Sequence, residues 1–189
     1  MSTTTTTVTI GPVSITVYPE AWPRDGFWRS DAFYWSNDYL TFGYVVYQHS
    51  TYIQFDDVTV RKGVKGDSVY IYGRSYSDYS DIPVKVRIYG VLSTSDTSYP
   101  NSVAAAEALP LTTAYVDWDI TEAWTDEIWY ASPDLCSIFD EVVAQEGWES
   151  GCSILLVIKD RGEDGVYFRR FDSYDFSTIT RPQLHITTF

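Results

Sequence analysis

Two aspartates, Asp117 and Asp119, stand two residues apart in the segment TTAYVDWDI, where polar and apolar residues alternate. In a β-strand this spacing places both carboxyl groups on one face, with their Cα atoms about 6.5–7 Å apart. Glycosidases use two carboxyl groups at a comparable separation, but those groups flank a cleft and one of them is protonated. Two acids on an open, solvated face both stay ionised. We therefore expect no catalysis from this pair.

The two histidines of the chain, His49 and His185, lack the surroundings of a catalytic or zinc-binding site. His185 alternates with Leu184 and Ile186, which predicts a place on the outward face of the last strand. His49 is expected in a loop. The sequence also lacks the nucleophile-elbow, zinc-protease, paired-cysteine and phosphate-binding glycine motifs. It therefore predicts no catalytic residues and a protein that is not an enzyme.

Acidic residues near the C-terminus offer ligands for a hard cation. Asp172 and Asp175 lie in the stretch FDSYD, and Ca²⁺ prefers carboxylate and backbone oxygen atoms. Residues 160–165, DRGEDG, do not keep the spacing of a calcium loop and favour a hairpin turn. We expect no cofactor, with a structural Ca²⁺ at Asp172 and Asp175 as the alternative.

Tyrosines are the main candidates for a binding role, because the chain has 16 Tyr, 9 Phe and 7 Trp. Tyr70, Tyr72 and Tyr89 occupy the polar phase of their segments, and Tyr76 and Tyr79 lie in the loop SYSDYSD. Rings gathered on one sheet face, with Ser and Asp nearby, are suited to stack against sugar rings. Ring pairs that hold the sheet together, or a subunit contact, are the alternative.

Short β-prone segments separated by turn signals must position these residues. Several of them alternate, whereas SILLVIKD carries a continuous apolar run, ILLVI, and should be covered on both sides. Residues 18–38, with two prolines and three tryptophans, are expected to form a structured loop. The pattern predicts an all-β, antiparallel β-sandwich. The main strand segments are 39–47, 51–55, 69–73, 84–92, 112–120, 153–160, 166–171 and 183–189.

One amphipathic helix is predicted over residues 133–146. Ser132 is suited to cap its start, Pro133 suits the first helical position, and Gly147 suits the position just after its end. We expect the apolar stripe of the helix to seal one end or face of the sandwich. The stripe consists of Leu135, Ile138, Phe139 and Val142.

Four polar or reactive residues belong to this helix and the strand after it. Asp140 and Glu141 lie off the apolar stripe, so they are expected to face water. Cys136 and Cys152 are too few for a disulfide framework. They are predicted to be buried free thiols, with a disulfide between them as the alternative.

The formal net charge of −13 argues against several partners. No cluster of Lys and Arg is available for phosphates or an anionic bilayer, so we expect no nucleic acid and no membrane as partner. The N-terminus lacks a basic region followed by an apolar one, which predicts no secretory signal. Residues 1–17 are predicted to form an N-terminal strand or arm, and residues 18–189 one domain. The β-prone arm residues that would add a strand to a neighbour are Thr3, Thr5, Thr7, Val8 and Ile10.

Taken in order, several segments resemble a known family of jelly-roll β-sandwich modules, the DNRLRE-type modules. The resemblance covers roughly residues 40–189, although the chain lacks the motif that gives the family its name. It implies a jelly-roll sandwich, links to carbohydrate binding and adhesion, and no catalytic residues. The matching segments are YIQFDDVTVRKGVKGDSVYIYG, PVKVRIYG, TTAYVDWDITEAW, PDLCSIFDEVVAQEGWESGCSILLVIKD, RRFDSYD and RPQLHITTF.

The family also includes virion proteins of tailed phages, and a single acidic module without a secretory signal resembles these most. The resemblance therefore implies a structural protein of the virion surface, either a capsid decoration (cement) protein or a fibre subunit. Such a protein is made in the host cytoplasm, contacts other capsid or tail subunits, and is expected to be a homo-oligomer. The alternative is an adhesive carbohydrate-binding module that recognises polysaccharide through the exposed tyrosines.

Overall fold

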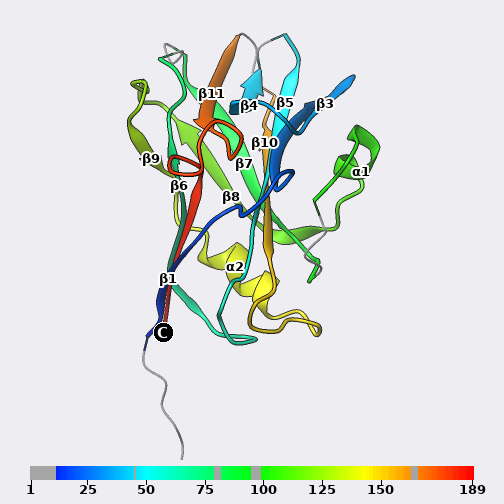
Figure 1. The fold of residues 1–189 in the computed structure, drawn as a ribbon, viewed down its shortest axis with the longest axis vertical. Helices are drawn as coiled ribbons and strands as arrows, with labels where there is room; N and C mark the ends of the chain where they lie inside the picture. Colours follow the sequence, from blue (N-terminus) through cyan, green and yellow to red (C-terminus); the bar gives the residue numbers. More distant parts are fainter. Residues whose placement is uncertain (1–11, 45, 79–81, 95–98, 163–165) are drawn as a thin grey trace, which may run out of the picture.

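The structure, a computed structural model, describes residues 12–44, 46–78, 82–94, 99–162 and 166–189. Within these ranges the chain forms twelve strands and two short helices, and all strand pairs are antiparallel. The predicted all-β antiparallel class is therefore confirmed, with two sheets packed on a shared core (Figure 1). The jelly-roll connectivity stays a prediction.

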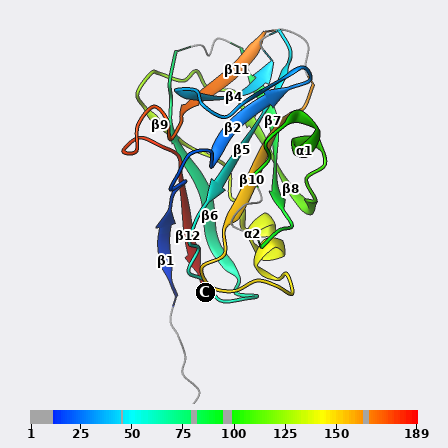
Figure 2. The same ribbon diagram turned by 45° about the vertical axis from the view of Figure 1, so that its right-hand side comes forward.

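The smaller sheet has four strands, which lie side by side in Figure 2 except for the short last one at its upper end. Residues 14–17, which the sequence places in the arm, form its first strand and pair with the last strand of the chain. The strands, in spatial order, are β1 (Ser14–Val17), β12 (Gln183–Thr188), β6 (Gly66–Arg74) and β9 (Trp129–Ala131).

The larger sheet contains the remaining eight strands. Six follow one another in space, and a short hairpin joins them through β5. The six are β11 (Tyr167–Asp172), β4 (Tyr39–Tyr44), β5 (Gln48–Phe55), β10 (Ile154–Asp160), β7 (Val84–Val91) and β8 (Leu111–Ile120). The hairpin consists of β2 (Asp25–Arg29) and β3 (Ala32–Tyr34).

The apolar strand β10 is buried on both sides, as its sequence predicts. Its inward residues join the main core between the sheets. On its outward side, Leu155 and Val157 pack with Trp28 and with Ala106 of helix α1 (Val103–Glu107) in a second apolar cluster. This helix was not predicted, and it covers the outer face of the larger sheet (Figure 2).

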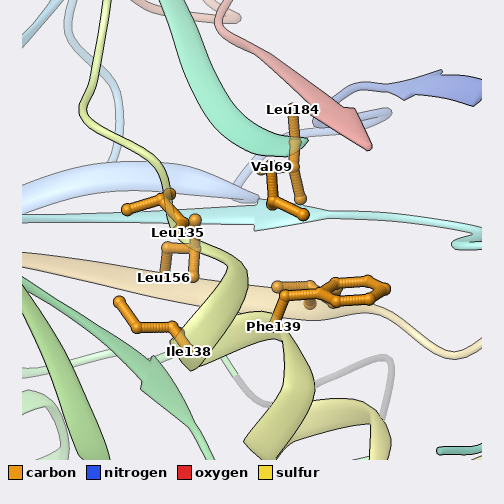
Figure 3. A pocket seen from close by; sticks show the side chains of 7 residues that line it. Val69, Leu135, Ile138, Phe139, Leu156 and Leu184 are labelled. Atoms are coloured by element: carbon orange, nitrogen blue, oxygen red, sulfur yellow. The ribbon is translucent and has the colours of Figure 1, made fainter. Parts of the chain in front are cut away.

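Helix α2 (Cys136–Val143) closes one end of the sandwich, which confirms the predicted sealing role (Figures 1 and 3). The four residues of the apolar stripe are all buried in the main core. Figure 3 shows Leu135, Ile138 and Phe139 gathered against Val69 of β6 and Leu156 of β10. The space left among these side chains measures only about 10 Å³, so the helix packs closely against both sheets.

The predicted start of this helix is wrong. The Ser132 hydroxyl does not cap a helix but accepts a hydrogen bond from the backbone N–H of Ile71, at 3.0 Å. Three residues later the N–H of Leu135 donates to the Val69 carbonyl at 2.7 Å. Residues 132–135 therefore still bond to β6, which delays the helix until Cys136. It also ends at Val143 rather than at residue 146.

The acids of α2 do not simply face water, contrary to the prediction. The Glu141 carboxylate accepts hydrogen bonds from the backbone N–H groups of Thr113 and Ala114, both at 2.8 Å. Asp140 accepts from the N–H of Gly66 at 2.9 Å and pairs with Lys65. Partial burial favours the neutral Glu141, but its hydrogen bonds outweigh this and lower its pKa. Both acids fasten the helix to strand residues.

Two further expectations fail. Residues 18–38 contain the β2–β3 hairpin as well as loop, because Phe27 and Trp28 are buried and β2 pairs with β5. His49 lies in β5 opposite Gly43 of β4 and is 6% exposed, so it is not a loop residue. Among the described residues, neither helix has the length and apolar character needed to cross a bilayer.

Candidate functional site

Four aromatic rings gather on the outward side of the smaller sheet. Tyr70 of β6 and His185 of β12 are direct cross-strand partners, and their rings stack with centroids 5.0 Å apart. Tyr72 stacks against Trp129 of β9 at 5.1 Å. The plane of the Tyr72 ring is also nearly perpendicular to the rings of Tyr70 and His185, at 87° and 85°. We call Tyr70, Tyr72, Trp129 and His185 the aromatic face.

Strand alternation creates this surface. In β6, Val69 and Ile71 are buried between the sheets, so Tyr70 and Tyr72 between and after them point outward. The register with β12 then places His185 beside Tyr70. All four rings are half-buried, because each gives part of its surface to a neighbouring ring.

Hydroxyl and amide groups surround these rings. The His185 imidazole has Nε2 at 2.8 Å from Oε1 of Gln183 and Nδ1 at 3.4 Å from the Thr16 hydroxyl. Burial lowers the pKa of His185, so the ring is neutral at pH 7. The hydroxyl groups of Ser14 and Thr187, 3.4 Å apart, continue the polar border along the same face.

The five tyrosines predicted as binding residues do not form one cluster. Tyr70 and Tyr72 belong to the aromatic face, but Tyr89 lies on β7 in the other sheet, against Tyr115. Tyr76 packs beside Tyr39 and Phe176 near the far end of β6. Tyr79 lies outside the described residues.

Sequence reasoning missed Trp129 and His185 as partners of the tyrosines. Trp129 belongs to a strand of only three residues, which has no readable alternation. The outward position of His185 was predicted and is confirmed, but its pairing with Tyr70 depends on which strands become neighbours. One sequence signal was available: Tyr70, Tyr72 and His185 all occupy the polar positions of alternating segments, which predicts that they face outward.

The two aspartates predicted as Ca²⁺ ligands, Asp172 and Asp175, lie in different environments. Asp172 is buried and pairs with the Arg74 guanidinium at 2.7 Å, while Asp175 is exposed. Burial raises the pKa of Asp172, and partial desolvation together with the nearby Asp38 raises the pKa of Asp175. Within the described part of the chain, no group of three or more His, Cys, Asp or Glu is arranged to hold a metal ion.

Asp117 and Asp119 share one outward face of β8, as predicted. Asp117 accepts two hydrogen bonds from Arg87, at 2.6 and 3.1 Å, and Asp119 pairs with Arg161. The bonds from Arg87 lower the pKa of Asp117. An ionised, cation-paired carboxylate is unsuited to act as a general acid.

Both cysteines are free thiols in the structure. The Cys136 Sγ lies 3.1 Å from Oδ1 of Asp134, and the Cys152 Sγ accepts from the N–H of Glu149 at 3.4 Å. Burial, followed by the interaction with Asp134, raises the pKa of the Cys136 thiol to about 12. A thiol with this pKa is a poor nucleophile at neutral pH.

A second aromatic surface lies at the loops beside β2 and β3. Trp22 is 54% exposed and Trp35 is 41% exposed, and they line a shallow hollow of about 180 Å³ with Pro23, Pro100 and Asn101. Asn101 alone among the lining residues has a hydrogen-bonding side chain besides the indoles. This surface therefore has rings but few polar partners for a ligand.

The arm residues Thr3, Thr5, Thr7, Val8 and Ile10 lie outside the described residues. A scan against protein-family models found no match to this chain, and a search of curated proteins also found none. The resemblance to DNRLRE-type modules consequently rests on the sequence segments alone.

Proposed function

We propose that this protein is a non-catalytic carbohydrate-binding module that contacts polysaccharide through the aromatic face. The observation that carries the proposal is the gathering of Tyr70, Tyr72, Trp129 and His185 on one solvent-facing sheet surface. Aromatic rings supply apolar contact area, while tyrosine hydroxyl and tryptophan N–H groups supply polar contacts at their edges. Sugars present both kinds of surface.

The polar border of the aromatic face supports a sugar ligand over a purely apolar one. This border lies on β12 and on its neighbour β1. It is formed by the hydroxyl and amide groups of Thr16, Gln183 and Thr187, which both donate and accept hydrogen bonds. Binding sites for small polar ligands combine apolar rings with a few placed polar groups. The hollow at Trp22 and Trp35 has the rings without this border.

The alternative is that the rings only stabilise the sheet as cross-strand pairs. A glycan array with the wild type and the double variant Tyr70→Ala/Tyr72→Ala tests the proposal. Tyr89→Ala, on the outward face of the other sheet, is a matched control, and thermal unfolding confirms that each variant is folded. We expect binding to be lost only in the double variant. No binding by the wild type, or equal binding by the folded double variant, rejects the proposal.

We propose virion assembly as a second function, because β1 is an edge strand. It pairs with β12 on one side, and no strand of the described residues pairs with its other side. Such an edge can accept a strand from a neighbouring subunit, and the β-prone arm precedes it directly in the sequence. Mass spectrometry of purified particles would detect the protein. Deletion of residues 2–10 should prevent incorporation while the domain stays folded, and full incorporation without them contradicts the idea.

A further inference from the structure

We infer that the aromatic face selects neutral polysaccharides and discriminates against acidic ones. The inference rests on the proposed carbohydrate-binding function and names the chemical class of its ligand. The charges on the outward side of the smaller sheet point to this selectivity. The described outward residues near the rings are Ser14, Thr16, Ser68, Arg74, Ala131, Gln183 and Thr187.

Arg74 is the single cation at these register positions, and two carboxylates already neutralise it. Arg181, two residues before Gln183, is paired with Glu20 at 3.4 Å. One guanidinium nitrogen lies 2.7 Å from Asp172 and another lies 2.7 Å from Glu127. The Glu127 side chain is 71% exposed, so a ligand that approaches Arg74 also meets this carboxylate. A carboxylated or sulfated sugar would have to displace Glu127 to reach the guanidinium.

His185 supplies no positive charge at neutral pH. Its ring lies against Tyr70, and its two nitrogen atoms face Gln183 and Thr16, whose side chains are uncharged. Neutral imidazole presents one donor and one acceptor nitrogen, which matches hydroxyl-rich ligands better than anions.

The charge of the whole chain acts in the same direction. A formal net charge of −13 repels anionic polymers at low ionic strength. An acidic sugar on the aromatic face would also lose water from its charged group without gaining an unpaired cation. Neutral sugars avoid both costs.

Matched polysaccharide pairs test the inference, for example dextran with dextran sulfate and hydroxyethyl cellulose with carboxymethyl cellulose, within a wider panel of neutral polymers and their acidic derivatives. Affinity is measured at low and at high salt. We expect each acidic derivative to bind at least about tenfold more weakly than its neutral parent at low salt. The difference should shrink at high salt, because salt screens exposed charges.

A charge-changing variant isolates the role of the face. Glu127→Gln removes the exposed carboxylate beside Arg74 and leaves Asp172 in place, so it should raise affinity for the acidic derivatives. Glu149→Gln makes the same change in net charge in the loop after α2 and should have little effect.

The outcomes separate the two proposals. Binding of an acidic polymer as tight as that of its neutral parent, and dependent on Tyr70 and Tyr72, overturns the selectivity and leaves carbohydrate binding standing. Absence of binding to every polymer in the panel overturns both. If the double variant Tyr70→Ala/Tyr72→Ala still binds neutral polymers more tightly than acidic ones, the ligand binds elsewhere, and the inference is overturned.

Discussion

The imidazole of His185 lies parallel to the phenol ring of Tyr70, with an angle of 3° between the two planes. The two residues are 115 positions apart in the chain and directly opposite each other in the register of β6 and β12. The stack therefore depends on the pairing of these two strands, and it forms part of the surface that we propose binds carbohydrate.

Acidification should weaken the fold through His185. Burial lowers its folded pKa below the usual 6.5, so the unfolded chain takes up this proton first as the pH falls. The stabilisation from neutral His185 is complete above about pH 6.5 and is lost as the pH falls toward the folded pKa. His185→Gln should reduce the loss of unfolding free energy below pH 6.5, measured by urea titration at several pH values. An unchanged pH profile in this variant would contradict the assignment.

Asp25 should weaken the fold as the pH rises, the opposite of the effect of His185. It is 3% exposed, and burial raises its pKa from 3.8 to about 7, although the Tyr174 N–H donates to it. The native protein therefore holds a proton that the unfolded chain has released, so its stability falls as the pH rises from about 4 to 7. Asp25→Asn keeps the shape without the charge. At pH 8 we expect a Tm higher by on the order of 5 °C, and no gain at pH 4; an equal change at both pH values argues against titration as its cause.

The Glu141 carboxylate should be a stability determinant. It accepts from two backbone N–H groups at the start of β8, and a donor left without a partner costs about 1–3 kcal/mol. We expect Glu141→Ala to lower the free energy of unfolding by about this amount, measured by urea denaturation. Glu146→Ala, an exposed position just after α2, is the control. Equal effects of the two changes would show that Glu141 only faces water.

Gly90 of β7 should not tolerate a side chain. An added Cβ would lie 2.7 Å from Val142 and 2.8 Å from Ile138, both on the apolar stripe of α2. Gly90→Ala should push the helix away from the sheet and cost about 1–3 kcal/mol of unfolding free energy. At Gly147 the nearest atoms belong to the Thr94 side chain, so Gly147→Ala should cost less. A neutral Gly90→Ala would mean that the helix packs differently.

The two thiols should remain titratable in protein purified without reductant. Thiol reagents should count two free cysteines after unfolding, and one disulfide would contradict the structure. In the native protein Cys136 should react slowly at pH 8, because its pKa is about 12. Asp134→Asn removes the neighbouring negative charge and should increase the rate.

Much of the fold followed from local patterns. Alternation identified the faces of β6, β7 and β8, and the continuous apolar run identified β10 as buried on both sides. The spacing of Leu135, Ile138, Phe139 and Val142 identified the sealing helix. These patterns are readable because burial imposes a period on the side chains of each element separately.

Contacts between distant segments decided the rest. Ser132 is a good helix cap by residue type, but its hydroxyl accepts a hydrogen bond from the Ile71 N–H of β6, and the helix begins later. Glu141 lies off the apolar stripe, yet the start of β8 lies within reach of its carboxylate. The aromatic face combines residues from β6, β9 and β12. The sequence by itself determined that Tyr70 and Tyr72 point outward, whereas only the tertiary structure placed Trp129 and His185 beside them, because strand order and register depend on how the whole chain packs.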